Sequence, residues 1–288
     1  MTAGLGPRAV ERATASPERR GAHRRAQLGA YALWQLRDYV VDRGVPTLIV
    51  SLLLGYMTYD GIVNQVGEMF PNPIAQFGSR AAAQAAMKSW LNYAFVSSAL
   101  GAFVFVAALF AMNGIVSNDR KLGYYRFLFA KPMSTSRYYG QAFVIHFAGF
   151  LVVTALLGAV YGVLVSPVLS WKLMGVVATI FLCYAGVAFG LSAAARWDWL
   201  SLVAVSVASE YLWSRHGAST SVLARLLYLL PPVPRFRDAV AAVAGQPSFV
   251  QGPAPAMPWN LLWWIAGYGA ACFVVGLIVL RHRRLAIA

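Results

Sequence analysis

The sequence predicts an all-α polytopic membrane protein with six transmembrane helices. Three observations support this fold class: the chain is 59% hydrophobic, only 12% of its residues are charged, and the charges leave long segments free. A soluble domain has roughly 25% charged residues. Four of the charge-free runs reach or exceed the roughly 20 residues that a membrane-spanning helix needs. Such long uncharged runs indicate a bilayer rather than an aqueous core.

We predict the six spans at residues 45–63, 90–116, 139–165, 171–195, 197–213 and 259–280. They belong to a transmembrane domain over residues 44–288, with a cytoplasmic coupling loop at 117–138 and an extracytoplasmic loop at 214–258. Another outer segment, residues 74–89, is expected to form a short surface helix. Tryptophans mark most of the proposed ends, as is typical of a membrane interface.

The distribution of Lys and Arg predicts an N-in, C-in orientation. With the N-terminus in the cytoplasm, 17 of the 24 Lys and Arg residues fall on cytoplasmic segments and 7 on outer segments. Basic residues beside spans stay on the cytoplasmic side. This bias accounts for the net charge of +14 without a nucleic-acid partner. If the fifth segment only re-entered the membrane, the C-terminus would move outside, with three arginines on the wrong side.

Two segments precede the first span. Residues 1–25 are polar and Arg-rich, without the apolar stretch of a signal peptide, and we expect a disordered cytoplasmic tail. Residues 26–43 carry Leu33, Leu36 and Val40 at helical spacing. They are predicted to form an amphipathic interfacial helix that lies at the inner surface of the membrane.

The loop after the second span, residues 117–138, is basic and rich in aromatic residues. Asn118 or Asp119 can cap a helix that runs to about Ala130, since their side chains accept hydrogen bonds from the free amides of a helix N-terminus. Pro132 ends this predicted helix. A loop of this composition fits two interpretations: arginines and tyrosines hold it to lipid headgroups, or it docks a soluble partner.

The order of residues in the loop narrows that choice. The relevant segments are Asp119-Arg120-x-x-Gly123, Arg126-x-Leu128, Ala130-Lys131-Pro132-Met133-Ser134 and Arg137-Tyr138-Tyr139-Gly140. Together they resemble the loop between the second and third spans of ABC-2 type transporter permeases. Gln141 stands where that family usually has Lys, and Asp119 where Glu is commoner. The layout agrees as well, with an amphipathic helix before the first of six spans and a Pro-containing outer segment before the last.

The resemblance implies the permease subunit of an exporter in the bacterial inner (cytoplasmic) membrane, paired with a second permease subunit as a homo- or heterodimer. A separate cytoplasmic ABC ATPase would supply ATP and Mg²⁺ chemistry, because this chain has no phosphate-loop motif; the chain itself is predicted to be no enzyme and to bind no cofactor. The implied ATPase contact comprises Asp119, Arg120, Gly123, Arg126, Phe129 and Pro132. Trp34 and Arg37 on the amphipathic helix would support that contact. The aromatic second span favours a lipid-like or amphiphilic cargo.

Two polar residues within the spans are candidates for a transport path, since ionisable groups at membrane depth often mark one. His146 lies in the third span, where packing or hydrogen bonding is the simpler interpretation. Glu210 lies near the outer end of the fifth span, where an interfacial ion pair near Trp213 and Arg215 is the simpler one. Paired carboxylates, metal-spaced His/Cys clusters and Ser/His/Asp sets are missing from the sequence pattern, so no metal site and no catalytic residues are predicted.

Small residues inside the spans are interpreted as packing residues. Cys183 and Cys272 both fall in apolar runs, where a disulfide has no evident purpose. Gly149, Gly158 and Gly162 lie near one face of the third span and allow helices to approach closely.

Two other functions fit a six-span layout. A secondary transporter or channel is one, although that class usually has broken helices and polar groups near the midplane. A membrane-anchoring or assembly subunit without transport is the other.

Overall fold

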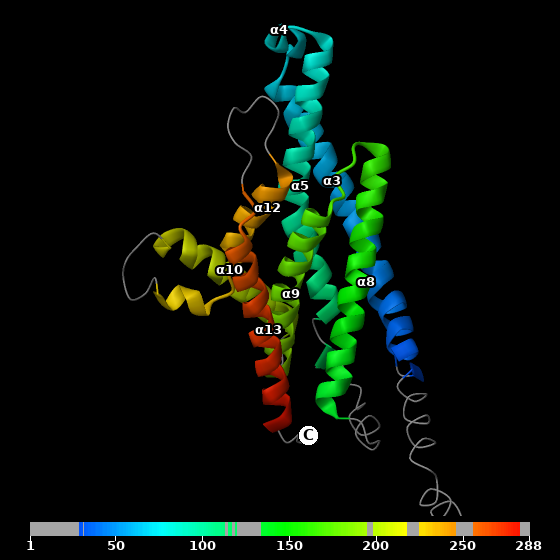
Figure 1. The fold of residues 1–288 in the computed structure, drawn as a ribbon, viewed down its shortest axis with the longest axis vertical. Coiled ribbons are helices and arrows are strands. Elements are labelled where there is room, and N and C mark those ends of the chain that lie inside the picture. The colour runs from blue at the N-terminus through cyan, green and yellow to red at the C-terminus, as the bar shows by residue number, and fades with distance from the viewer. Residues whose placement is uncertain are drawn as a thin grey trace, which may run out of the picture.

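The computed structural model describes residues 29–30, 32–112, 115–116, 119, 134–194, 198–217, 225–245 and 256–282. Every regular element among these residues is a helix. Five helices are long and apolar enough to cross a membrane: Ala32–Met69, Arg80–Met112, Thr135–Leu164, Trp171–Ala194 and Trp259–His282. An all-helical fold with several membrane-length helices, as expected of a multi-pass membrane protein, is therefore confirmed (Figure 1).

The first of these helices is longer than predicted. Residues Ala32–Met69 form one helix, which includes the π-helical turn η1 (Val40–Gly44) and then α3 (Val45–Met69). The sequence prediction had separated an interfacial helix at 26–43 from a span at 45–63. The structure instead continues the helix across that boundary, so the N-terminal segment extends the span rather than lying beside it.

The π-helical turn explains how the helix passes Pro46. Proline lacks an N–H, and in an ordinary helix its ring clashes with the carbonyl four residues earlier. Here the N–H of Val45 bonds to the carbonyl of Val40, five residues back. This wider turn accommodates the proline without ending the helix.

The second long helix is also extended. α4 (Pro73–Phe77) is a single short turn capped by Asn72, whose side chain accepts a hydrogen bond from the N–H of Ala75 at 3.4 Å. Gly78, at a positive φ of 76°, turns the chain into α5 (Arg80–Met112). The predicted surface helix at 74–89 is thus divided between α4 and the first turns of α5, which continue without a break into the second span.

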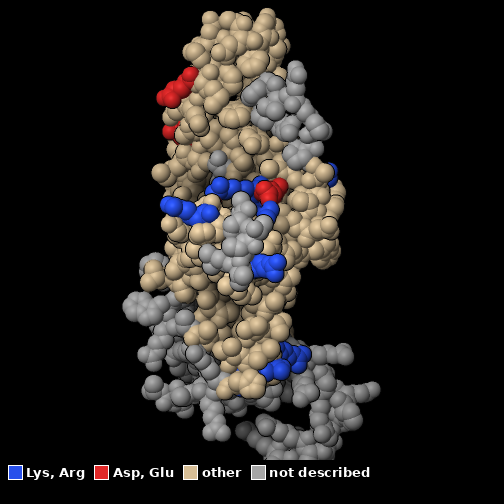
Figure 2. All heavy atoms as spheres, turned by 90° about the vertical axis from the view of Figure 1, so that its left-hand side faces the viewer, with Lys and Arg blue, Asp and Glu red and all other residues tan. Residues whose placement is uncertain are grey.

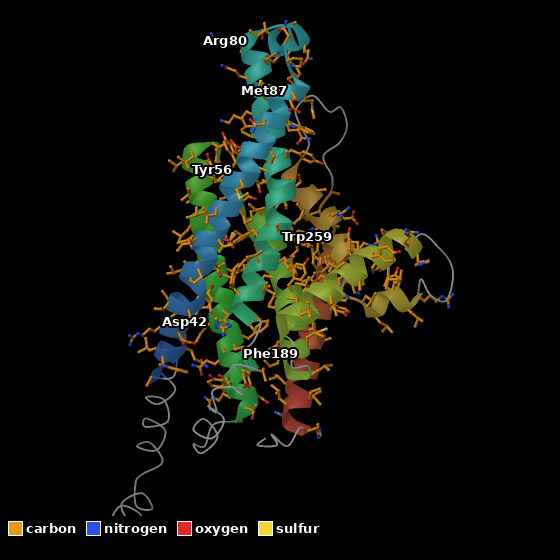
Figure 3. All side chains as sticks on the ribbon, turned by 180° about the vertical axis from the view of Figure 1, so that it is seen from behind. Asp42, Tyr56, Arg80, Met87, Phe189 and Trp259 are labelled. Atoms are coloured by element: carbon orange, nitrogen blue, oxygen red, sulfur yellow. The ribbon has the colours of Figure 1, made fainter. Side chains whose placement is uncertain are left out.

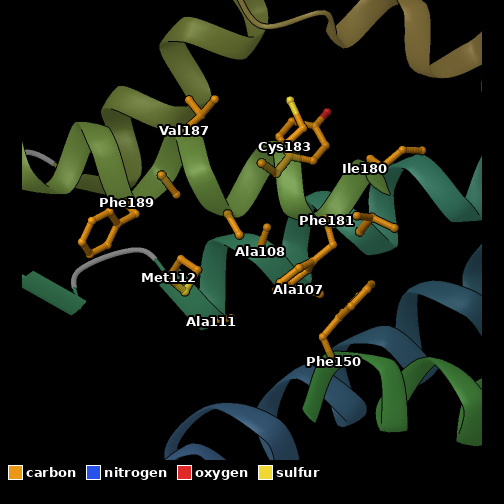
Figure 4. Packing of buried hydrophobic residues seen from close by; sticks show 14 of the residues in the cluster. Ala107, Ala108, Ala111, Met112, Phe150, Ile180, Phe181, Cys183, Val187 and Phe189 are labelled. Atoms are coloured by element: carbon orange, nitrogen blue, oxygen red, sulfur yellow. The ribbon is translucent and has the colours of Figure 1, made fainter. Parts of the chain in front are cut away.

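The remaining membrane-length helices pack around α9 (Trp171–Ala194), the most buried of the five. α8 (Thr135–Leu164) runs antiparallel to it, whereas α13 (Trp259–His282) runs parallel to it (Figure 1). Phe181 of α9 stacks on Phe150 of α8, with ring centroids 4.1 Å apart. On the side of α5, small Ala107 and Ala108 lie under α9 (Figure 4).

The predicted fifth span at 197–213 falls on α10 (Asp198–His216). This helix is not among the five, and Figure 1 shows it projecting to the side of the bundle. The chain returns through η2 (Leu227–Leu229), η3 (Val233–Arg235) and α12 (Phe236–Ala244). Figure 2 shows acidic and basic side chains gathered at mid-height on this face. A full six-span topology is therefore not confirmed.

The start of α8 and the end of α13 lie side by side at one end of the bundle, where Arg281 donates to the hydroxyl of Ser136 at 3.0 Å. The first helix also enters the bundle from this end, which we call the basic end (Figure 1). It carries Arg43, Arg137 and Arg281. Because α9 and α13 are parallel, the segment from α10 to α12 brings the chain back to the opposite end before α13 begins.

Candidate functional site

The N-terminal part of the first helix turns a polar face inward. Gln35, Tyr39 and Arg43 recur every fourth residue, and Gln35 and Tyr39 are buried. Residues at this spacing share one side of a helix. The apolar residues predicted to anchor the helix point outward instead. They are Leu33, Leu36 and Val40, which are 69%, 45% and 46% exposed.

Arg43 joins this helix to the end of α5. Its guanidinium donates a 3.2 Å hydrogen bond to the carbonyl of Phe110 and another to that of Ala111. The two hydrogen bonds tie the first helix to the backbone of α5 near the last described residues of that helix.

Asp119 is buried and tied to α8. It is only 9% exposed, and one carboxylate oxygen accepts a 3.1 Å hydrogen bond from the hydroxyl of Tyr139. Burial raises the pKa of the Asp119 carboxyl from 3.8 to about 6; the Tyr139 hydrogen bond and the charge of Arg43 oppose this, while Asp38 adds to it. The carboxyl is therefore poised to change its charge just below neutral pH.

Packing around Tyr39 holds the same helices together. Its ring lies 5.0 Å from that of His146 on α8, and His146 Nδ1 lies 3.4 Å from the sulfur of Met112 on α5. Gly149 makes this possible, because a Cβ there would lie 2.1 Å from the Tyr39 ring. We call Tyr39, Arg43, Asp119, Tyr139 and His146 the Arg43 junction.

The structure describes only part of the predicted ATPase contact. Arg120, Gly123, Arg126, Phe129 and Pro132 lie outside the described residues, as does the predicted helix to Ala130. Asp119 is described and lies inside the protein, where it can hold the start of the loop but offers little surface to a partner.

Trp34 and Arg37 are exposed on the first helix, and they stay the predicted support of the ATPase contact. Arg43, on the inward side of the same helix, is near enough to Asp119 for its charge to lower the pKa of that carboxyl. The sequence signal for Arg43 was its position as the last basic residue before a charge-free run, four residues after Tyr39.

The two intramembrane candidates have structural partners. His146 is buried within the Arg43 junction, in agreement with the packing interpretation. Glu210 forms an ion pair with Arg237 of α12, not with Arg215, whose guanidinium lies over the ring of Tyr211 at 5.4 Å. Because both members of the Glu210 pair are solvent-accessible, it contributes at most about 1 kcal/mol.

Within the described residues, no group of three or more His, Cys, Asp and Glu side chains could hold a metal ion. Cys183 and Cys272, both within this part of the chain, are free thiols. Comparisons of the chain with family models, curated proteins and solved structures found no match.

Proposed function

We propose that this chain is the permease subunit of an ABC-2 type, ATP-driven exporter of the bacterial inner membrane. A separate ATPase would dock on the loop at residues 117–138, and a second permease subunit would complete the transport path. The cargo would be lipid-like or amphiphilic. The order of residues in the loop is the basis of this assignment, and the multi-pass helical fold is compatible with it.

The Arg43 junction is compatible with such a coupling role for the loop. The loop begins next to a buried carboxyl that is bonded to α8 through Tyr139, and Arg43 of the first helix is bonded to the end of α5. A partner that moved the loop would therefore act on three helices together. Rigid-body movements of packed helices are a common means of switching between conformations.

The test is co-purification of a Walker-motif ATPase with the tagged chain from native membranes. Arg126→Glu should abolish this association and any transport that depends on it, because it reverses charge in the predicted docking helix. Arg80→Glu is the matched control, since Arg80 is an exposed arginine at the other end of the bundle and its variant should still bind. The proposal fails if no such ATPase is retained, or if Arg126→Glu retains it as well as Arg80→Glu does.

A further inference from the structure

The described residues contain a cavity of about 500 Å³ between α3, α5, α8 and the start of α9. We call it the α3–α8 cavity. Sites for small molecules typically have about 300–1,000 Å³ and mostly apolar walls. The lining here is largely aliphatic and aromatic, so the cavity has the size and chemistry of a site for a hydrocarbon ligand.

Small residues keep the cavity open. Ser51 and Gly55 of α3 and Gly158 of α8 all line it. A Cβ added at Gly55 would meet only the end of the Phe95 ring, 4.0 Å away. Larger apolar side chains at these positions would fill the space, as side chains do in most well-packed protein interiors.

Part of the cavity wall is exposed on α3 and α8. Its rim includes Leu52 and Tyr56 of α3 and Val160 and Leu164 of α8, all of which are large and exposed; Tyr56 is labelled in Figure 3. Exposed apolar side chains continue along both helices beside the rim, for example Leu53 and Val152. This exposed apolar surface suits contact with lipid. The acyl chains of the surrounding bilayer would therefore lie against the rim of the cavity.

The length of the cavity matches one lipid chain. Along α8 its wall runs from Thr154 to Leu164, a rise of about 15 Å at 1.5 Å per residue. Half of a typical hydrocarbon core of about 30 Å is the same length. At the Leu164 end, Tyr161 donates to Asn92 at 3.0 Å and Asn92 donates to Ser166 at 2.7 Å, a polar cluster beside which a headgroup can lie.

We propose that the α3–α8 cavity binds one acyl chain of a bilayer lipid. The chain enters between α3 and α8 with its headgroup near the Tyr161–Asn92–Ser166 cluster, and its end reaches toward Ser51. This site lies within a single copy of the chain and needs no ATPase. Its existence is therefore independent of the function proposed above.

Two residues on the inner wall make the proposal testable. Leu173 and Val177 of α9 line the cavity but are 7% and 1% exposed. Lipid surrounding the bundle cannot touch them except through the cavity. By contrast, Leu53 on α3 is exposed to surrounding lipid whatever the cavity holds.

The experiment uses the purified full chain in vesicles of phosphatidylethanolamine and phosphatidylglycerol that contain a phosphatidylcholine with a diazirine on one acyl chain. After illumination, peptide mass spectrometry locates the cross-links. In the parent protein we expect cross-links at Leu173 or Val177 as well as at Leu53. Cross-links at Leu53 without any at Leu173 or Val177 would overturn the proposal.

Gly55→Phe and Ser51→Leu fill the cavity from α3. In each variant, cross-links at Leu173 and Val177 should fall to the background seen in a sample that was not illuminated. Cross-links at Leu53 should stay as they are in the parent protein. Gly61→Phe is the matched control, because Gly61 is an exposed glycine of the same helix with no atom within 4 Å of an added Cβ. Gel filtration confirms that each variant is folded. If inner-wall labelling persists in folded Gly55→Phe or Ser51→Leu, the chain does not bind in this cavity.

Discussion

Asp119 is the residue at which the loop and the helices are chemically connected. Its carboxyl is buried, it accepts from Tyr139, and the guanidinium of Arg43 and the carboxyl of Asp38 lie near enough to influence its charge. A buried carboxylate is costly unless it is well compensated. Since its pKa is raised despite two compensating groups, desolvation outweighs them.

This imbalance predicts a pH-dependent stability. Folded protein keeps Asp119 protonated up to about pH 6, whereas the unfolded chain keeps it protonated only up to about pH 3.8. The contribution of this group to stability is fully present below pH 3.8 and is lost as the pH rises through 6. Asp119→Asn should remove this loss of stability at higher pH. The measurement is the thermal unfolding midpoint of the protein in detergent between about pH 3.8 and pH 6 and above.

The control for this experiment is Asp60→Asn, which removes an exposed carboxyl of α3 and should keep the pH profile of the parent. If the unfolding midpoints of the parent and of Asp119→Asn changed with pH in the same way, the burial of Asp119 would be contradicted.

The inward polar face of the first helix shows why sequence reasoning did not single out Arg43. Amphipathic patterns are interpreted by assuming that the apolar side is covered by protein. In a membrane, however, the apolar side can face lipid while polar groups turn inward to find partners. Leu33 and Leu36 are accordingly exposed, and Arg43 is directed to the carbonyls of α5.

At the level of helices, the tightest contact joins α9 and α13. A Cβ at Gly186 would lie 2.0 Å from the carbonyl oxygen of Gly269, and one at Gly276 would lie 2.8 Å from the Phe189 ring. Such close approach lets backbones pack directly, which is how helices associate in membranes. Gly186 and Gly190 have G-x-x-x-G spacing, but their partners come from a distant helix that local pattern cannot identify.

We predict that Gly269→Val destabilises the protein strongly. The new side chain would meet the carbonyl oxygen of Leu182 at 2.4 Å and the Cα of Cys183 at 2.6 Å, and backbone atoms cannot move aside. Overpacking of this kind costs about 1–3 kcal/mol and sometimes more. The thermal unfolding midpoint and the yield of monodisperse protein should both fall.

Gly267→Val provides the comparison on the same helix, because no atom lies within 4 Å of a Cβ at that position. It should behave like the parent. If Gly267→Val and Gly269→Val lowered the unfolding midpoint equally, the cause would be valine in α13 and not the contact with α9.

For the molecule as a whole, the charge-free runs were enough to predict the long apolar helices. Their true lengths were not predictable, because Pro46 suggested a boundary that the π-helical turn bridges. The fifth span was the weakest prediction for a physical reason: acidic Asp198 and Glu210 interrupt its apolar character. The site was predictable only as a loop in sequence, whereas the surroundings of Asp119 depend on Tyr139 of α8 and on Arg43 and Asp38 of the first helix.

The parallel arrangement of α9 and α13 yields a prediction about sidedness. With the basic end in the cytoplasm, Ser134→Cys should react with an impermeant maleimide only after cells are broken. Gln76→Cys on α4 and Ala256→Cys just before α13 should react in intact spheroplasts. All three positions are exposed, and Cys183→Ala/Cys272→Ala removes the native thiols.

The result at Ala256→Cys is the decisive one. Labelling there from the same side as Ser134→Cys would mean that the segment containing α10 and α12 does not carry the chain back to the far end. The parallel packing of α9 and α13 in the membrane would then be wrong.

The glycine contact between α9 and α13 also bears on how the protein is made. α9 ends at Ala194, and its partner begins only at Trp259. During synthesis, the most buried helix therefore enters the membrane long before the surface that covers Gly186 exists. Until α13 is made, the face of α9 that carries Gly186 has lipid as its neighbour, so the closest backbone contact of the protein forms only after its last long helix has entered the membrane.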